Sequence, residues 1–314
     1  MGVMLRKLKQ YAPARVLLWV FHTVRAFFVY PLNFRSRLEY LGHRNTFGLS
    51  PAEEAWLATL RREGIVMIDL LFDMSDIERI NLQLDQLLTD QANRDITNVN
   101  AFNHENKLRL ERPISKIPDL AGIAFNETIC KIASAYKGFI PIHVLNVYKT
   151  VPGDALQGSS NFHRDDLGDM SVFVYLHDVD AHSGASCYVK RSHGYTLKSC
   201  FLLSNYEKGL RDPNQAYADS EVAEFYPRQD WVWCNARRGT VVMMDVTGIH
   251  KGPYWTVGDP LNTARNVVHM VFRQKNLFRS ASIPDRAIDD GLEAGLGAVG
   301  RLVCRQYVEQ TRAQ

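Results

Sequence analysis

Apolar residues between positions 50 and 137 recur mostly three and four apart, which is the spacing of helices with one buried face. Residues 50–53 read Ser-Pro-Ala-Glu, the signature of a capped helix start, and Gly64 supplies a stop. Residues 75–78 repeat the signature as Ser-Asp-Ile-Glu, and a third helix is predicted from Leu120 to Tyr136. Between the helices we expect a short strand over Ile65–Leu71 and a polar loop over residues 90–115.

The pattern changes after residue 138 to short β-rich runs separated by Gly, Pro, Asp and Asn, which is typical of an antiparallel jelly roll. No fixed repeat and no low-complexity linker divides the chain. We therefore predict a mainly β fold with helical additions: helices over residues 50–137, a double-stranded β-helix (a jelly roll, or cupin-like barrel) over 138–275, and a C-terminal helical extension over 276–314. The predicted strands are Ile142–Thr150, Ser171–Leu176, Ala185–Lys190, Thr240–Val246 and Val267–Arg273.

The net charge of +3 is unevenly distributed along the chain. Residues 1–38 contain seven basic residues and no acidic one, so the remainder holds 30 basic and 34 acidic residues. A nucleic-acid binder is expected to spread basic charge over its folded body, and we therefore exclude that class. The longest apolar run of the basic segment is too short to cross a bilayer, which takes about 20 apolar residues.

Basic residues lie close to Trp19, Phe21, Phe27 and Phe28 in this N-terminal segment, residues 1–45, as in a helix that lies on a membrane surface. A helix that packs on the barrel explains the same pattern equally well. The five cysteines have no CxxC spacing and are odd in number, which argues against a disulfide framework or a structural zinc site. We expect a cytoplasmic protein, either free or peripheral to a membrane through residues 1–38, with an oligomeric state that the sequence leaves open.

One of the ten histidines stands two residues before a carboxylate, in His163-Arg164-Asp165. On an extended segment these two side chains can turn toward one point, although a surface histidine beside an aspartate gives the same triplet. His250 follows a predicted strand and offers a second imidazole. Two histidines and one carboxylate leave three positions open on iron, which is the ligand set of oxygen-activating non-haem Fe(II) enzymes.

Arg265 opens the last predicted strand, and its guanidinium is suited to hold the far carboxylate of a dicarboxylic cosubstrate. Because strand side chains alternate, His269 shares a face with Arg265 and is a candidate for lining the same pocket. A core histidine bonded to a neighbouring backbone is the alternative. Asn146 and Tyr148 share a face of an earlier strand and are candidates for further contacts with the cosubstrate.

The sequence resembles the phytanoyl-CoA dioxygenase family of Fe(II)- and 2-oxoglutarate-dependent oxygenases over about residues 60–275. The resemblance rests on an ordered set of motifs rather than on any one of them. The set comprises Asn146-Val147-Tyr148, Asn161-Phe162-His163-Arg164-Asp165, residues 175–180, Gly184, Arg191-Ser192-His193-Gly194, residues 239–242, His250 and Arg265. The chain departs from the family at Lys190-Arg191, where a proline-glycine turn is more usual.

The resemblance implies that His163, Asp165 and His250 bind Fe(II), and that Arg265 binds 2-oxoglutarate. It also implies that O2 is the third participant, that succinate and CO2 are released, and that an unactivated C–H bond is hydroxylated. In related halogenating enzymes a small residue replaces the carboxylate, so Asp165 favours hydroxylation. The expected substrate is a small molecule, a lipid or a lipid-linked compound. A jelly-roll binding protein without catalysis, and a cupin-type metalloenzyme that does not use 2-oxoglutarate, are the two alternatives.

Residues 196–238 form an unusually long connection between two predicted strands and contain seven aromatic residues: Phe201, Tyr206, Tyr217, Phe225, Tyr226, Trp231 and Trp233. Long connections of this kind are commonly lids over a binding site. A satellite core beneath the connection is the alternative. His193 is interpreted as a turn residue, His177 and His182 as solvated, and Arg109 and Arg112 as candidates to meet an anionic substrate.

Overall fold

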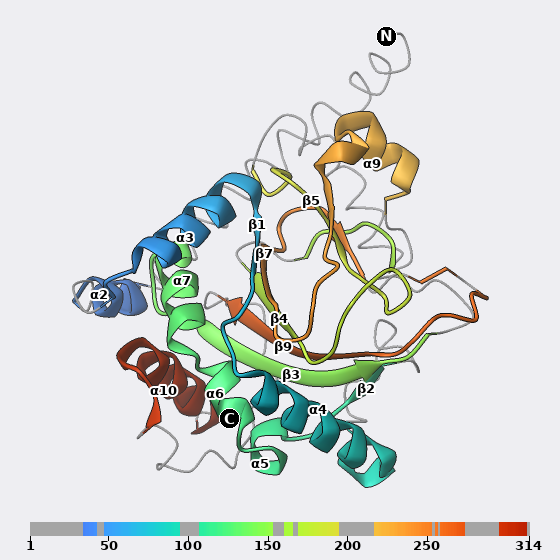
Figure 1. The fold of residues 1–314 in the computed structure, drawn as a ribbon. Coiled ribbons are helices and arrows are strands. Elements are labelled where there is room, and N and C mark those ends of the chain that lie inside the picture. The colour runs from blue at the N-terminus through green and yellow to red at the C-terminus, as the bar shows by residue number, and fades with distance from the viewer. Residues whose placement is uncertain are drawn as a thin grey trace.

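A computed structural model of the chain describes residues 34–42, 47–94, 107–152, 160–165, 169–194, 217–252, 255–256, 258–273 and 295–312. A six-stranded antiparallel sheet and a three-stranded antiparallel sheet form its centre (Figure 1). The larger sheet has the order β1 (Ile65–Ile68), β7 (Val241–Asp245), β4 (Met170–Tyr175), β9 (Arg265–Arg273), β3 (Ile142–Thr150) and β2 (Lys107–Arg109). The smaller sheet has the order β6 (Trp231–Trp233), β5 (Cys187–Val189) and β8 (His250–Lys251).

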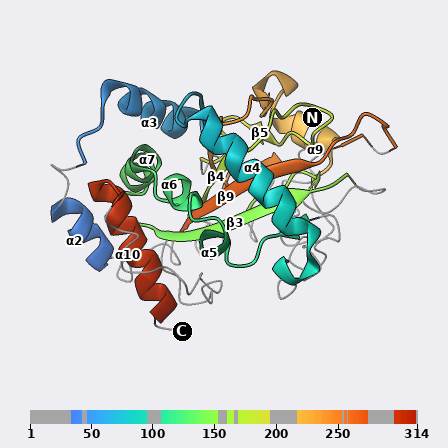
Figure 2. The same ribbon diagram turned by 60° about the horizontal axis from the view of Figure 1, so that its bottom comes forward.

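Helices cover the outer face of the larger sheet, while the smaller sheet lies toward its other face (Figure 2). Together with the comparisons below, this arrangement confirms the predicted fold class, a mainly β double-stranded β-helix with helical additions. The helices are α2 (Phe34–Gly42), α3 (Pro51–Glu63), α4 (Met74–Thr89), α5 (Pro113–Lys116), α6 (Leu120–Ala124), α7 (Glu127–Lys137), α9 (Asp219–Phe225) and α10 (Ala298–Arg312), with short 3-10 turns at Gln91–Asn93 and Arg228–Asp230.

Helix α3 begins and ends where its sequence predicts. The Ser50 side chain accepts from the backbone N–H of Glu53, and the Glu53 carboxylate accepts from the backbone N–H of Ser50, so the first turn is capped reciprocally. Gly64 ends the helix with φ near 80°, a left-handed conformation that glycine adopts without steric cost. The chain then enters β1 directly, and this junction lies beside the candidate site described below.

Three local predictions need correction. Helix α4 is capped by Asp73 rather than Ser75, because the Asp73 carboxylate reaches the Ser75 backbone N–H. The helix predicted over Leu120–Tyr136 is two helices, since Asn126 leaves the helical conformation and caps α7. Residues 90–115 are not wholly a loop: they contain β2 and the start of α5. Strand β2 was missed because only three residues pair, which is too short for an alternation to be visible.

Alternation along the strands divides the larger sheet into two faces. Val268, Met270 and Phe272 of β9 face the helices and are fully buried in the main apolar core. Arg265, Val267 and His269 alternate with them and face the barrel interior, where the register places Thr150, Tyr148 and Asn146 of β3 opposite. The predicted pairing of Arg265 with His269 on one face is therefore confirmed.

The structure describes the connection between β5 and β7 up to residue 194 and from residue 217 onward. It contains α9 and β6, and its aromatic residues Tyr217, Tyr226 and Trp231 pack with Phe162 in a separate apolar cluster. Phe225 packs against that cluster, and Trp233 is 40% exposed. Tyr217, Phe225, Tyr226 and Trp231 therefore belong to a satellite core rather than to a lid, whereas Phe201 and Tyr206 lie outside the described residues.

Most of the basic N-terminal segment, residues 1–33 and 43–46, also lies outside the described residues. No described helix is long and apolar enough to cross a membrane. Four of the five cysteines are described, and all four are buried and free of disulfides: Cys130, Cys187, Cys234 and Cys304. The predicted C-terminal extension contributes α10, whose N-terminal backbone N–H groups at Val299 and Gly300 donate to the Glu127 carboxylate.

Candidate metal centre

Backbone pairing brings together two segments that are far apart in the sequence. His163 and His250 exchange two backbone hydrogen bonds, with N–O distances of 2.8 and 3.0 Å, so the segment that carries His163 lies against β8. Two residues later the Asp165 N–H donates to the Val246 carbonyl at 2.9 Å. The smaller sheet therefore holds His163, Asp165 and His250 in one place.

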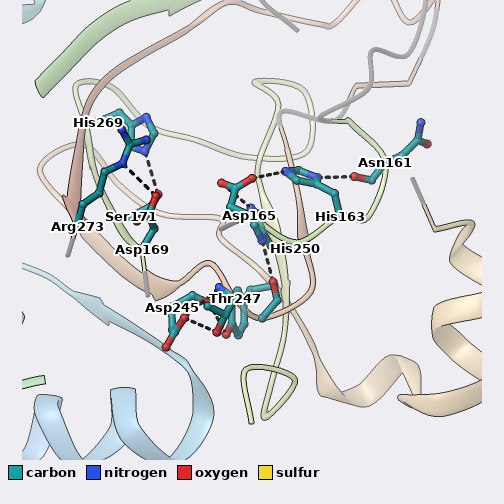
Figure 3. Close-up of polar contacts among 12 residues, drawn as sticks. Asn161, His163, Asp165, Asp169, Ser171, Asp245, Thr247, His250, His269 and Arg273 are labelled. Carbon is teal, nitrogen blue, oxygen red and sulfur yellow. Dashed lines mark hydrogen bonds and ion pairs between the residues drawn. The ribbon is translucent and has the colours of Figure 1, made fainter. Parts of the chain in front are cut away.

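Their side chains converge, as Figure 3 shows. The two Asp165 oxygens each lie 3.7 Å from an imidazole Nε2, one from His163 and the other from His250. The candidate ligand atoms of the three residues all lie within 4.8 Å of one another. Among the described residues, this is the one group of three or more His, Cys, Asp or Glu side chains close enough to hold a metal ion.

Both imidazoles are oriented by the backbone two residues before them. His163 Nδ1 lies 2.9 Å from the Asn161 carbonyl oxygen, and His250 Nδ1 lies 3.0 Å from the Gly248 carbonyl oxygen. A carbonyl accepts, so each Nδ1 carries the proton and each Nε2 keeps its lone pair toward Asp165. Metal-binding histidines usually have their second nitrogen held in this way.

The charges at the centre suit a cation. Burial, with a smaller contribution from the neighbouring His250, lowers the pKa of His163 to about 4, so the ring is neutral at pH 7. For Asp165, desolvation raises the pKa, but the two neighbouring imidazoles outweigh it and leave the pKa below its ordinary value. The Asp165 side chain is 48% exposed, against 27% for His163 and 11% for His250, so the carboxylate is at the solvent side of the group.

A buried hydrogen-bond network supports these residues from behind, and the sequence reading missed it. The Arg164 guanidinium, 8% exposed, donates to the carbonyls of Thr247 and Ser192 at 2.8 and 3.0 Å. The Asp245 carboxylate accepts from the backbone N–H and hydroxyl of Thr247 and from the Tyr136 hydroxyl. Asp-Val-Thr-Gly before His250 is an Asx-turn sequence, and this was the signal available.

The Tyr188 hydroxyl joins this network to the helical region. It donates to the Asp245 carbonyl at 2.9 Å. Gly64 and Gly248 both approach that hydroxyl so closely that a Cβ atom at either position would overlap it. The end of α3, the turn before His250 and strand β5 therefore meet at one oxygen atom.

Arg265 lies inside the barrel, 1% exposed, and uses part of its donor capacity. Its Nη1 donates to the Gly184 carbonyl at 2.8 Å and to the Ser186 hydroxyl at 3.1 Å, whereas its buried Nε has no hydrogen-bond partner among the described residues. The buried hydroxyl of Thr150, directly opposite Arg265 in the β3–β9 register, is also without a partner there. Unsatisfied buried polar groups are costly, so this pair suits a polar ligand. Thr150 was not predicted, although the strand register reveals it.

His269 also faces the interior. It contacts the Ser171 hydroxyl at 3.1 Å through Nε2 and stacks on Phe173 with ring centroids 4.3 Å apart. The Tyr148 ring lies edge-on to the His269 ring, with centroids 6.1 Å apart, and Asn146 lies opposite His269 in the β3–β9 register. Burial, followed by the charge of Lys107, lowers the pKa of His269 well below its ordinary value. The structure thus brings Asn146, Tyr148 and His269 together, and their contact with a cosubstrate stays a prediction.

Other histidines have structural partners. His177 Nε2 accepts from the Asn266 backbone N–H at 2.8 Å, so the expectation that it is solvated is wrong. His182 is 45% exposed and pairs with Asp259 at 3.3 Å. His193 contacts the Arg61 carbonyl at 3.1 Å, which agrees with a turn role. Arg112 is exposed beside Glu111, whereas Arg109 lies on β2.

Comparisons with known proteins support the fold. No family model matches the chain, so the resemblance to the phytanoyl-CoA dioxygenase family stays a prediction. No curated protein matches it either. The solved structures it resembles include the non-haem α-ketoglutarate-dependent epimerase SnoN from nogalamycin biosynthesis, with 16% identity, 71% of this chain and 83% of that chain covered, and a TM-score of 0.52.

Two other structures give the same result. EctD from S. alaskensis, solved with 2-oxoglutarate and 5-hydroxyectoine, has 16% identity, 72% and 76% coverage of this and that chain, and a TM-score of 0.51. The non-haem α-ketoglutarate-dependent carbocyclase SnoK from nogalamycin biosynthesis has 18% identity, 72% and 85% coverage, and a TM-score of 0.50. The chain therefore shares the fold of non-haem α-ketoglutarate-dependent enzymes.

Proposed function

We propose that this chain is a non-haem Fe(II)- and 2-oxoglutarate-dependent oxygenase. The observation that carries the proposal is the convergence of His163, Asp165 and His250 within the fold of α-ketoglutarate-dependent enzymes. Two imidazoles and one carboxylate form the ligand set that leaves iron open to further ligands. Membership of the phytanoyl-CoA dioxygenase family is the finer form of the same proposal.

The interior also fits a dicarboxylic cosubstrate. The partly unsatisfied Arg265 guanidinium and the unpartnered Thr150 hydroxyl would donate hydrogen bonds to the far carboxylate of 2-oxoglutarate, and Tyr148, Asn146 and His269 would line the pocket. A jelly-roll binding protein without catalysis would not require Arg265 and Thr150 together with a group of metal-binding residues. A cupin-type enzyme without 2-oxoglutarate would have no carboxylate for Arg265 to bind.

Iron, 2-oxoglutarate and O2 together supply the oxidising power to hydroxylate an unactivated C–H bond, with succinate and CO2 as coproducts. The protein contributes position. The carbonyls of Asn161 and Gly248 keep the two Nε2 lone pairs on the metal side, and the Arg164 network keeps the two ligand segments at a set spacing. Asp165 is the most exposed of the three residues, so substrate would approach a bound metal from the side of this carboxylate.

Hydroxylation is the proposed outcome because Asp165 occupies the position that halogenating relatives leave free for chloride. Enzymes of the same fold include an epimerase and a carbocyclase, so the products of the reaction have to be identified directly. The proposed substrate is a small molecule, a lipid or a lipid-linked compound. A cytoplasmic location, with contact to a membrane surface through residues 1–38, belongs to the same proposal.

Anaerobic addition of Fe(II) and then 2-oxoglutarate tests the assignment. We expect a weak visible charge-transfer band that requires both additions. Arg265→Met should raise the concentration of 2-oxoglutarate that is needed to produce the band, while iron still binds. His250→Ala should remove iron binding itself. A protein that binds iron but shows no 2-oxoglutarate-dependent band would be the cupin-type alternative, and one that binds neither would be the binding protein.

A further inference from the structure

The Arg265 guanidinium is oriented by two acceptors that lie just before β5. Its Nη1 donates to the Gly184 carbonyl at 2.8 Å and to the Ser186 hydroxyl at 3.1 Å. In a guanidinium, Nη1 is on the same side as Cδ, so these bonds leave the opposite edge, formed by Nε and Nη2, for a carboxylate. The positions of Gly184 and Ser186 therefore decide where that edge points.

The Trp255 indole packs directly on Gly184. Trp255 is 7% exposed, and a Cβ atom at Gly184 would lie only 2.4 Å from its ring. Gly184 has φ near 71°, so a residue with a side chain would be strained there as well as overlapping the ring. The indole therefore fixes the backbone whose carbonyl holds Arg265.

The same indole is tied to the segment that leads into β9. Its N–H donates to the Thr263 carbonyl at 3.1 Å, two residues before Arg265. The Thr263 N–H in turn donates to the His182 carbonyl at 2.8 Å, in the turn that carries Gly184. Trp255 thus contacts both the acceptor of Arg265 and the backbone that precedes it, so removal of the indole would loosen both.

The proposed metal group is connected to this junction through Gly252. Gly252 follows His250 by two residues and packs on Ser186: a Cβ atom would lie 2.4 Å from the Ser186 hydroxyl oxygen and 2.8 Å from its Cα. The segment after a proposed iron ligand therefore contacts the second acceptor of Arg265. Direct contacts hold the metal group and the guanidinium at a set separation.

A set separation selects the length of the molecule that spans it. A 2-oxo acid bound at the metal through its keto oxygen and near carboxylate reaches the guanidinium only if its carbon chain has the right length. 2-Oxoglutarate has two methylene groups in this part of the chain, and 2-oxoadipate has three. One methylene group changes binding to a site of fixed size by about 10- to 200-fold.

We propose that Trp255 is a positioning residue that makes the protein select 2-oxoglutarate over longer 2-oxo acids. The inference rests on the proposed oxygenase function and adds to it the residue that sets the cosubstrate length. Trp255 acts through Gly184 and Arg265 rather than by contact with the cosubstrate. Without the indole, the turn at Gly184 and the guanidinium shift together, and a longer chain is accommodated.

Anaerobic titration of the Fe(II) protein with 2-oxoglutarate and with 2-oxoadipate tests the inference. Both compounds chelate iron through the same atoms, so both produce the charge-transfer band, and the band gives a Kd for each. We expect the wild type to bind 2-oxoglutarate about 10- to 200-fold more tightly than 2-oxoadipate. Trp255→Ala should lower this ratio about tenfold by weakening 2-oxoglutarate, while iron affinity stays unchanged.

Three further variants separate positioning from a general loss of structure. Gly184→Ala places a Cβ atom where the indole lies and should lower the ratio in the same direction. Trp255→Phe keeps an aromatic ring and loses the indole N–H, so it should keep most of the ratio. Trp56→Leu is the matched control, because this tryptophan packs against the main core from α3: it should lower stability to urea and leave the ratio unchanged.

A ratio in Trp255→Ala equal to the wild-type ratio, with both 2-oxo acids weakened alike or neither weakened, overturns the inference. A wild-type ratio near one overturns it as well, because chain length is then not selected. If Trp255→Ala does not fold, the ratio in Gly184→Ala decides in its place. A wild type that shows no band with either compound refutes the oxygenase proposal and the inference with it, whereas a band with an unchanged ratio refutes the inference alone.

Discussion

The two faces of strand β9 have different compositions within nine residues. The helix-facing side, Val268, Met270 and Phe272, is apolar and fully buried. The interior side carries Arg265 and His269, and the Arg265 Nε is buried without a partner among the described residues. One face gains stability by removing apolar area from water, whereas the other keeps a buried Arg265 Nε–H that a ligand could satisfy.

Residues that stabilise the fold and residues suited to binding are therefore neighbours on the same strand. They are separated because their side chains point to opposite faces of the sheet. A substitution on one face should therefore affect folding, and one on the other should affect binding. Each of the following variants tests that separation.

The largest expected effect is on the interior side, at the metal centre. His250→Ala removes one of three ligands, and we expect iron affinity to fall by more than about 100-fold and succinate release to fall to background, because even indirect supports of a ligand are worth 10- to 100-fold. Iron content and succinate release measure this. His182→Ala, at an exposed histidine, should leave both unchanged. Normal iron content in His250→Ala would contradict the ligand assignment.

Phe272→Ala tests the other face. The ring is fully buried against His143, with centroids 5.1 Å apart, so its removal leaves a cavity and should cost about 3–5 kcal/mol of unfolding free energy. Urea unfolding measures the cost. Iron affinity per folded molecule should be unchanged, and a parallel loss of iron affinity would show that the two faces are coupled.

Arg164→Met tests whether the support behind the ligands is more than structural. The carbonyls of Thr247 and Ser192 lose their donor, so the two ligand segments lose their set spacing. We expect iron affinity to fall about 10- to 100-fold. The Co(II) absorption spectrum should also change shape, which a loss of stability alone would not produce. Arg164→Lys should recover part of the affinity.

The smallest effect concerns acid stability and His143, on the helix-facing side. Burial lowers the pKa of this ring to about 3, whereas an unfolded histidine titrates near 6.5, so the unfolded chain binds more protons below pH 6.5 and stability falls as the pH falls. His143→Phe removes this contribution. Between pH 7 and pH 5 the variant should lose about 2 kcal/mol less unfolding free energy than the wild type. Identical losses would show that His143 is protonated in the folded state.

Features set by local sequence were predictable. The capping box of Ser50 and Glu53, the stop at Gly64 and the main strands depend on neighbouring residues, and the structure reproduces them. The grouping of His163, Asp165 and His250 was also predicted, because the HxD triplet, the histidine after a later strand and Arg265 occur together in the order of the resemblance. The three residues do lie together, and iron binding by them remains to be measured.

Features set by tertiary contact were not predictable. Strand β2 exists because Lys107–Arg109 find the edge of β3, and nothing in three residues reveals that edge. The roles of Arg164 and Thr150 depend on which backbone lies opposite, which alternation along one strand cannot tell. His177 was misjudged for the same reason, since its partner Asn266 is 89 residues away.

The crowded hydroxyl of Tyr188 has a consequence for how the protein can be divided. A fragment that starts at residue 138 would retain every proposed ligand, but it would lack Gly64, whose carbonyl accepts from the Asp245 N–H and whose missing side chain leaves room for Tyr188. The turn before His250 would then lose one of the segments that pack against it. The N-terminal helices therefore support the proposed iron site, and we expect the shortened protein to take up no metal.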